Sequence, residues 1–171
     1  MIHLRKLEPT DLPFLYQWEN DALMWADSET HNPLSRQDLR AYIQSTTGDI
    51  YCDGQLRLMI CEKKDGDSDD GVTLGCVDLF DFDARNRKAA IGLYVSPAAR
   101  GRGVGRETMV QLMHYAFDFL HLRMLYVVVR TTNEACMSIY RDLNFTPSAV
   151  LKGWTLEGDV TIWQRLGNQE I

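Results

Sequence analysis

Long apolar runs are missing from this sequence. None approaches the roughly 18 residues that a membrane-spanning helix needs. The N-terminal residues Met1 to Arg5 are not followed by the apolar segment of a signal peptide. We therefore expect a cytoplasmic protein with no membrane partner.

Cysteine and histidine are scarce, with four of each, and neither shows the spacing of a metal site. The absence of a Cys-x-x-Cys pair predicts reduced thiols and no zinc. The acidic stretch 64–71 has the aspartate spacing of a calcium loop. However, Asp70 stands where position six requires glycine, and Cys76 stands where position twelve requires glutamate. We expect no metal.

Positive charge is in deficit. The chain has 18 Lys and Arg against 24 Asp and Glu, a formal net charge of −6. Nucleic-acid-binding proteins are usually basic, so we expect no nucleic acid partner, whereas a cationic substrate such as an amine is compatible. The 171 residues, 45% of them hydrophobic, are enough for one core. No repeat or linker interrupts them, so 1–171 should form a single domain.

The most informative stretch is 89–120, which combines a strand, a glycine-rich turn and a helix. Alternating apolar residues at 89–95 predict the strand. Apolar residues at steps of three and four between Met109 and Leu120 predict an amphipathic helix, and the turn 100–106 (RGRGVGR) adds three arginines. The first N–H groups of a helix are unpaired and its dipole favours negative charge. We infer a pyrophosphate-binding site.

Neither of the two best-known phosphate loops fits this turn, because Gly-Lys-Ser/Thr and G-x-G-x-x-G are both absent. The turn resembles the acetyl-CoA loop of the GNAT N-acetyltransferases, Gln/Arg-x-x-Gly-x-Gly/Ala, which Arg100, Gly103 and Gly105 match. Residues 133–145 (NEACMSIYRDLNF) resemble the family pattern Asn-x-x-Ala-x-x-Leu-Tyr-x-x-x-Gly-Phe, with cysteine and asparagine replacing the usual alanine and glycine.

The predicted order of elements, β-αα-βββ-α-β-α-ββ, also resembles that of GNAT proteins. The resemblance implies a mixed α+β fold with a central, mostly antiparallel, twisted sheet, a splay between the two central strands, and flanking helices. It covers nearly the whole chain and is greatest to the branch of spermidine and ribosomal-protein N-acetyltransferases. Dimers are common in that family, so we expect a homodimer.

By this resemblance, acetyl-CoA is the expected co-substrate. Backbone groups of Leu93, Tyr94 and Val95 would pair with its pantetheine arm like an added strand, and Asn133 would hydrogen-bond to the same arm. Tyr140 would protonate the leaving thiolate as general acid, although its place on an apolar helix stripe also suits core packing. The diphosphate would lie on Arg100, Gly101, Arg102, Gly103, Val104, Gly105 and Arg106.

The general base is less clear from the sequence. Many relatives in the resembling branch carry glutamate where this chain has Ala90. Asp78 is the substitute that we predict, because it is a carboxylate on an otherwise apolar strand face, where it needs either a function or a partner. Glu29 is the second choice, and a structural aspartate is the alternative for Asp78.

The acceptor pocket is expected, by the same resemblance, between the first and second strands. Trp25, Asp27 and Glu29 are the predicted acceptor-binding residues in this aromatic and acidic region, with Glu19 and Asp21 nearby, and solvated surface charge is the alternative for each. The acceptor would be a polyamine, another small amine or a peptide N-terminus. A non-catalytic acyl-CoA sensor on the same fold is the competing function.

Overall fold

The computed structural model describes residues 1–25, 32–63 and 71–167. A π-helical turn, Tyr115–Phe119, continues the longest helix. In chain order, the strands and helices are β1 (Ile2–Lys6), α1 (Leu12–Glu19), α2 (Ala22–Trp25), α3 (Arg36–Ser45), α4 (Ile50–Asp53), β2 (Leu56–Glu62), β3 (Val72–Asp83), β4 (Lys88–Val95), α5 (Val104–His114), β5 (Met124–Arg130), α6 (Glu134–Asp142), β6 (Thr146–Thr155) and β7 (Gly158–Leu166).

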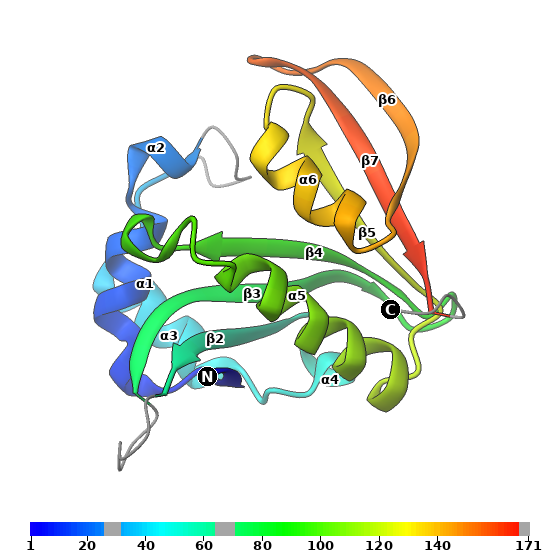
Figure 1. Ribbon diagram of the computed structural model, residues 1–171. Helices are drawn as coiled ribbons and strands as arrows, with labels where there is room; N and C mark the ends of the chain where they lie inside the picture. Colours follow the sequence, from blue (N-terminus) through cyan, green and yellow to red (C-terminus); the bar gives the residue numbers. More distant parts are fainter. Residues whose placement is uncertain (26–31, 64–70, 168–171) are drawn as a thin grey trace.

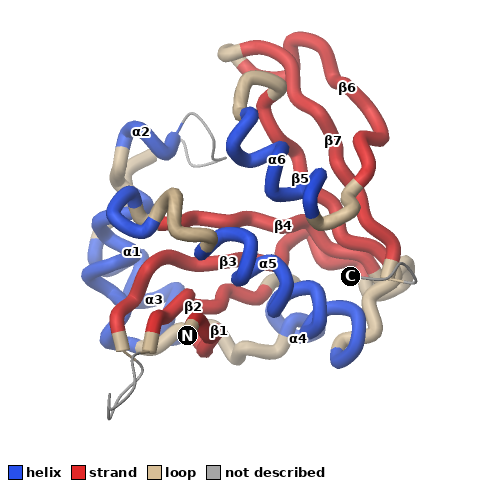
Figure 2. The backbone as a smooth tube through the Cα atoms, in the orientation of Figure 1, coloured by secondary structure: helices blue, strands red, loops and turns tan. Residues whose placement is uncertain are grey.

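The strands form one seven-stranded sheet in the order β1-β2-β3-β4-β5-β7-β6. All neighbours are antiparallel except β4 and β5. This parallel pair is short, since it joins only Lys88–Ala90 with Met124–Tyr126. Beyond it the two strands diverge, and β5, β7 and β6 rise away from β4 (Figure 2). The predicted mixed α/β fold, with its mostly antiparallel sheet and central splay, is confirmed.

Helices cover both faces of the sheet (Figure 1). On one face, apolar residues of α1 and α3, among them Leu15 and Leu39, pack on Met59 and Cys76 of the sheet. On the other face, the predicted stripe of α5 is buried in the main core, which also includes residues from β4, β5 and β7. α6 packs on β5 and β7 beyond the splay. The sheet therefore separates α5 on one face from α1 and α3 on the other. The splay is the gap in this sheet between the diverging parts of β4 and β5.

Local sequence signals explain several helix ends. Ser35 and Asp38 form a capping box at the start of α3, as a Ser-x-x-acid pattern predicts. Asn144 follows α6 with a φ of 58°, the left-handed conformation that asparagine tolerates better than most residues. The short helices α2 and α4 were not predicted, because four-residue helices carry too little periodicity to be recognised.

The outer edge of β1 is protected by α5. Glu107 accepts a hydrogen bond from the backbone N–H of Ile2 at 3.3 Å. Gln111 donates to the carbonyl of the same residue at 2.8 Å. An edge strand with free backbone groups tends to pair with other chains, so these two side chains stabilise the domain and also block that pairing at Ile2.

Arg165 on β7 is a buried cation, 1% exposed, that sequence reasoning missed. Its guanidinium donates to the carbonyl of Leu143 at the C-terminal end of α6. Burial lowers the pKa of Arg165, while the negative end of the helix dipole favours the cation there. The contact fixes α6 to the second half of the sheet.

All four cysteines are free, as expected. In the ranges 1–25, 32–63 and 71–167, no helix has the length and apolar character needed to cross a bilayer. Within the same ranges, no group of three or more His, Cys, Asp or Glu side chains is arranged to hold a metal ion.

Four surface aspartates are held by hydrogen bonds that favour their charged form. Ser35, Asn86 and Lys152 bind three of them. At the fourth, Asp53, desolvation acts in the opposite direction but is outweighed by hydrogen bonds from Thr47 and its neighbours. The side chains with a lowered pKa are Asp38, Asp53, Asp83 and Asp159.

The lowered pKa values predict how stability depends on pH. A carboxyl group whose pKa is lower in the folded state stabilises the fold above its unfolded pKa, about 3.9 for aspartate, and this stabilisation is lost as the pH falls through the folded value. We expect the melting temperature to be level between about pH 7 and 5 and to fall below about pH 4. Asp53→Asn should reduce that fall in differential scanning fluorimetry, and an unchanged profile would contradict the prediction.

Candidate active site

The candidate site lies where β4 leaves β5. Past Ala90, β4 pairs with β3 on one side, while its other side faces the splay. Leu93, Tyr94 and Val95, the predicted pantetheine contacts, all lie on this diverging part and are half-buried. A strand with one open edge can accept an extended ligand through backbone hydrogen bonds. The three residues thus lie along the open edge of β4, and their contact with the pantetheine arm stays a prediction.

The glycine-rich turn leads from the end of β4 into α5. Gly101 and Gly103 have φ values of 73° and 79°, a left-handed conformation that is costly for other residues. Gly103 is the N-cap of α5 and supplies no side-chain cap. The first N–H groups of α5, which include those of Val104 and Gly105, therefore keep the anion-binding potential expected of an uncapped helix start.

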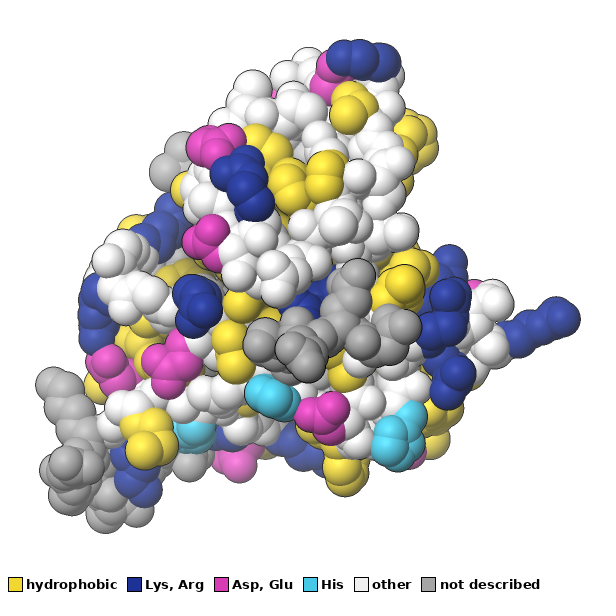
Figure 3. Space-filling view, turned by 45° about the vertical axis from the view of Figure 1, so that its right-hand side comes forward, with side chains coloured by type: hydrophobic (Ala, Val, Ile, Leu, Met, Phe, Trp, Pro, Cys, Tyr) yellow, Lys and Arg dark blue, Asp and Glu magenta, His cyan; other side chains and the backbone are white. Residues whose placement is uncertain are grey.

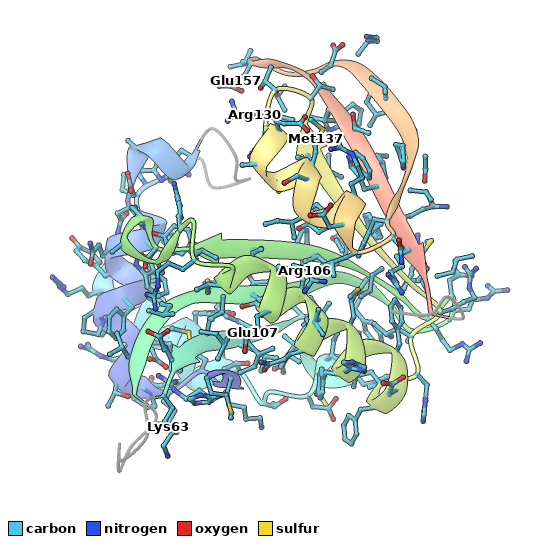
Figure 4. All side chains as sticks on the ribbon, viewed as in Figure 1. Lys63, Arg106, Glu107, Arg130, Met137 and Glu157 are labelled. Carbon is cyan, nitrogen blue, oxygen red and sulfur yellow. The ribbon has the colours of Figure 1, made fainter. Side chains whose placement is uncertain are left out.

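The three arginines of the turn differ in their contacts. Arg100 donates from Nε to the carbonyl of Val95 at 2.9 Å, which ties the turn to the end of β4. Arg102 is ion-paired with Glu62 at 2.5 Å. Arg106 projects from the first turn of α5 on the side where α6 lies, whereas Glu107 projects toward β1 (Figure 4). The turn thus brings positive charge to the uncapped helix start.

α6 forms the opposite wall of the splay. Asn133 caps this helix by accepting a hydrogen bond from the N–H of Cys136 at 3.1 Å. Ile139 reaches across to the turn, since its Cδ1 would be 3.2 Å from a Cβ added at Gly105. A side chain at position 105 would therefore crowd Ile139, which favours glycine there.

Tyr140 is 1% exposed and packs edge-on against Phe145, with ring centroids 5.1 Å apart. Burial raises the pKa of Tyr140 well above its ordinary value, and the Cys136 thiol, which shares a hydrogen bond with the phenol, acts in the same direction. The phenol therefore keeps its proton at neutral pH, as a general acid must. Its catalytic role stays a prediction, because the same burial suits core packing.

Asp78 has a partner that the sequence did not reveal. Nε of Arg57 donates to one of its carboxylate oxygens at 2.7 Å and Nη2 to the other at 3.0 Å. Nη1 of Arg57 donates to Glu19 at 2.6 Å. Burial is the largest single effect and lowers the pKa of Arg57, but the charges of Asp78, Cys76 and Glu19 and the hydrogen bond to Asp78 together outweigh it and raise that pKa. The alternation of Leu56 to Glu62 places Arg57 on a sheet face. This alternation was the one sequence signal that Arg57 could pair with Asp78.

The predicted acceptor residues are only partly described. Trp25 is half-buried, and its indole N–H donates to the carbonyl of Glu19 at 2.9 Å. Asp27 and Glu29 lie outside the described residues. Near Glu19, a cavity of about 280 Å³ opens between α1, α3 and β2, and it is lined by Glu19, Leu34, Asp38, Leu39, Tyr42, Gln55 and Arg57.

The surface is mixed in character. On the face shown in Figure 3, basic, acidic and apolar side chains are interspersed. The splay and the turn therefore mark the candidate site more clearly than the surface charge on this face does.

Comparisons with known proteins agree with this geometry. A family model described as the acetyltransferase (GNAT) domain matches residues 2–146. The chain is 28% identical over 149 residues to the spermidine N(1)-acetyltransferase of Escherichia coli strain K12, which covers 85% of this chain and 73% of that protein. It is 39% identical over 51 residues, 30% of each chain, to the N-alpha-acetyltransferase RimI of Mycobacterium tuberculosis.

Among solved structures, the spermidine N-acetyltransferase of Vibrio cholerae in complex with CoA and spermine superposes with a TM-score of 0.84. The identity is 20%, and the match covers 97% of this chain and 95% of that one. At this identity the superposition supports the fold, while the family model supports the relationship. The chain therefore belongs to the GNAT family and is an acetyltransferase.

Proposed function

We propose that this protein transfers the acetyl group of acetyl-CoA to a primary amine of a small polycation such as spermidine. The observation that carries the proposal is the splay, in which the open edge of β4 runs directly into the uncapped start of α5. The net charge of −6 and the carboxylate of Glu19 beside the cavity favour a cationic acceptor. Relatives named as spermidine acetyltransferases support the same choice.

The cofactor would lie along the splay. The N–H groups at 101–106 would bind the diphosphate, because an uncapped helix start attracts an anion. The backbone of Leu93 to Val95 would pair with the pantetheine arm. Asn133 already uses its side-chain oxygen to cap α6, so its side-chain nitrogen would be the group that donates to the arm.

The reaction forms a C–N bond and breaks a C–S bond. The amine must first lose a proton, since only the neutral amine has a lone pair for attack. The N–H of Val95 would stabilise the developing oxyanion, and Tyr140 would give its proton to the leaving thiolate. Alignment of the two substrates in the splay would supply a large part of the rate enhancement.

Asp78 is the sequence-based candidate for the proton acceptor, and this role stays a prediction. It lies on the sheet face opposite α5, but both of its oxygens accept hydrogen bonds from Arg57. That pairing also provides the partner that a structural aspartate on an apolar face requires.

Gly105→Val should weaken acetyl-CoA binding at least about tenfold. The added side chain would meet Ile139 and Leu93 and fill the space between the turn and α6, which is costly in a packed site. Isothermal titration calorimetry with CoA measures the effect. Ala135→Val, which places the same β-branched side chain on the exposed side of α6, is the control. Equal affinities for the two variants would contradict this placement of the cofactor.

The proposed activity can be tested by following release of the CoA thiol from acetyl-CoA with a panel of amines. The panel should contain spermidine, spermine, simple diamines, and peptides with a free N-terminus. We expect turnover with at least one polyamine and slower turnover with peptides. Binding of acetyl-CoA without turnover on any amine would instead favour the acyl-CoA sensor, which the comparisons do not support.

A further inference from the structure

Three residues form a row across the centre of the sheet. Phe80 on β3 is in register with Ala90 on β4, which is in register with Tyr126 on β5. Residues in register point to the same face of a sheet. Neighbours of the row, such as Leu79 and Leu125, are buried in the core beneath α5. Because side chains alternate along a strand, the row faces the opposite side, which is also the side of Asp78.

The carboxylate of Asp81 contacts Tyr126, one of the residues of this row. The hydroxyl of Tyr126 donates to Oδ2 of Asp81 at 3.4 Å. The two residues belong to β3 and β5, and β4 lies between these strands. Strands are about 4.8 Å apart, so the side chains span about 10 Å and meet over β4. Ala90, which is 3% exposed, lies in the row beneath them.

The backbone of Asp81 departs from regular strand geometry. Its φ is 47°, and it lies in a β-bulge between Phe80 and Asp83. A bulge redirects a side chain away from regular alternation, and a left-handed non-glycine residue is a local cost that is often found at functional sites. The contact also adjoins the splay, because Ala90 and Tyr126 are the last pair that joins β4 and β5.

We propose that Tyr126 and Asp81 form the proton relay that deprotonates the acceptor amine. The relay would replace the glutamate that many relatives carry at the position of Ala90. This assignment rests on the proposed function. The amine gives a proton to the oxygen of Tyr126 while Tyr126 gives its own proton to Asp81. Asp81 is exposed and then releases the proton to solvent, so no other reactant is needed.

The charged and titratable groups around the pair come from three strands. Lys88 on β4 places its ammonium 5.8 Å from the centre of the Tyr126 ring. Asp83, two residues along β3 from Asp81, binds Asn86 in the turn at 2.7 Å. Asp78 is three residues away and paired with Arg57. Among the residues that the structure describes, Asp81 is thus the carboxylate seen in contact with Tyr126, whereas Asp83 and Asp78 have other partners.

The test compares Asp81→Asn, Tyr126→Phe and Asp78→Asn in the full-length protein, with the most active amine of the panel. Asparagine tolerates the left-handed backbone of position 81, and phenylalanine retains the ring at position 126, so both variants should fold. General bases contribute about 10²- to 10⁴-fold. We expect kcat at pH 7 to fall about 10²-fold in Asp81→Asn and in Tyr126→Phe, with unchanged affinity for acetyl-CoA.

The pH dependence separates a catalytic from a structural effect. Amines such as that of lysine have a pKa of about 10.4, so more of the acceptor is neutral at high pH and needs no base. The deficit of both variants should shrink to less than about tenfold by pH 10. Controls are Asp118→Asn and Tyr51→Phe, whose side chains are exposed and which should match the wild type.

Three results would overturn the assignment of Tyr126 and Asp81 as the relay. If Asp81→Asn and Tyr126→Phe match the controls, or if Asp78→Asn alone shows the pH-dependent loss, the relay is wrong and the proposed function stands. If the wild-type protein binds acetyl-CoA but turns over no amine in the panel, both the relay and the proposed function are wrong.

Discussion

Tyr140→Phe is expected to lower kcat for acetyl transfer by about 10²- to 10³-fold, within the range of general acid catalysis. The KM for acetyl-CoA should change by less than about twofold. The phenol is buried and its pKa is raised, so it is protonated at neutral pH, and as a general acid it would lose its proton only when the C–S bond breaks. An interaction made only in the transition state affects kcat and not binding. Steady-state kinetics with acetyl-CoA and the best amine measures both constants.

Core packing is the competing role for Tyr140, and the same variant distinguishes the two. Phenylalanine keeps the ring that packs against Phe145, so the melting temperature should change by only a few degrees. Tyr16→Phe, a change on α1 at a ring that stacks with Arg36, is the control and should retain its rate. A Tyr140→Phe enzyme within about threefold of the wild-type kcat would show that the tyrosine is a packing residue.

Asp11→Ala is expected to cause the largest loss of stability among the substitutions considered. Asp11 is 1% exposed and accepts hydrogen bonds from Arg5 at 2.7 and 2.8 Å and from the N–H of Glu8 at 2.9 Å. The hydrogen bond that Arg5 donates to Asp11 raises the pKa of Arg5, although desolvation acts against it. Loss of one partner from such a buried pair costs about 3–5 kcal/mol.

For a domain of this size, 1 kcal/mol corresponds to about 2–4 °C in melting temperature. The expected fall for Asp11→Ala is therefore about 10 °C, measured by circular dichroism or fluorimetry. Glu134→Ala is the matched control, because Glu134 forms an exposed pair with Arg141 at 3.1 Å, and exposed pairs contribute at most about 1 kcal/mol. Equal melting temperatures for the two variants would contradict the importance of burial here.

Short-range patterns gave most of the secondary structure and the position of the glycine-rich turn. Alternation predicted β2 and β3, and steps of three and four predicted the buried face of α5. Ser35 and Asn144 marked helix ends through their own side-chain and backbone preferences. The start of β6 at Thr146 is hard to locate from the sequence, because its exposed residues carry no periodic apolar signal.

Contacts between distant residues were not accessible from the sequence. Arg57 and Asp78 are 21 residues apart, and Tyr126 and Asp81 are 45 apart. These pairs exist because strand order and register bring them together, and a local pattern contains neither. Arg165 appeared to be an ordinary polar residue at the end of a strand, yet it is buried beneath α6.

The sequence by itself determined the GNAT-like order of elements and the glycine-rich turn at 100–106, because both depend on neighbours within a few residues. Only the tertiary structure decided which side chains the carboxylates contact. It paired Asp78 with Arg57 and brought Asp81 to Tyr126 above Ala90. The physical reason is that hydrogen bonding and burial depend on distance in space, which the pairing of the strands sets.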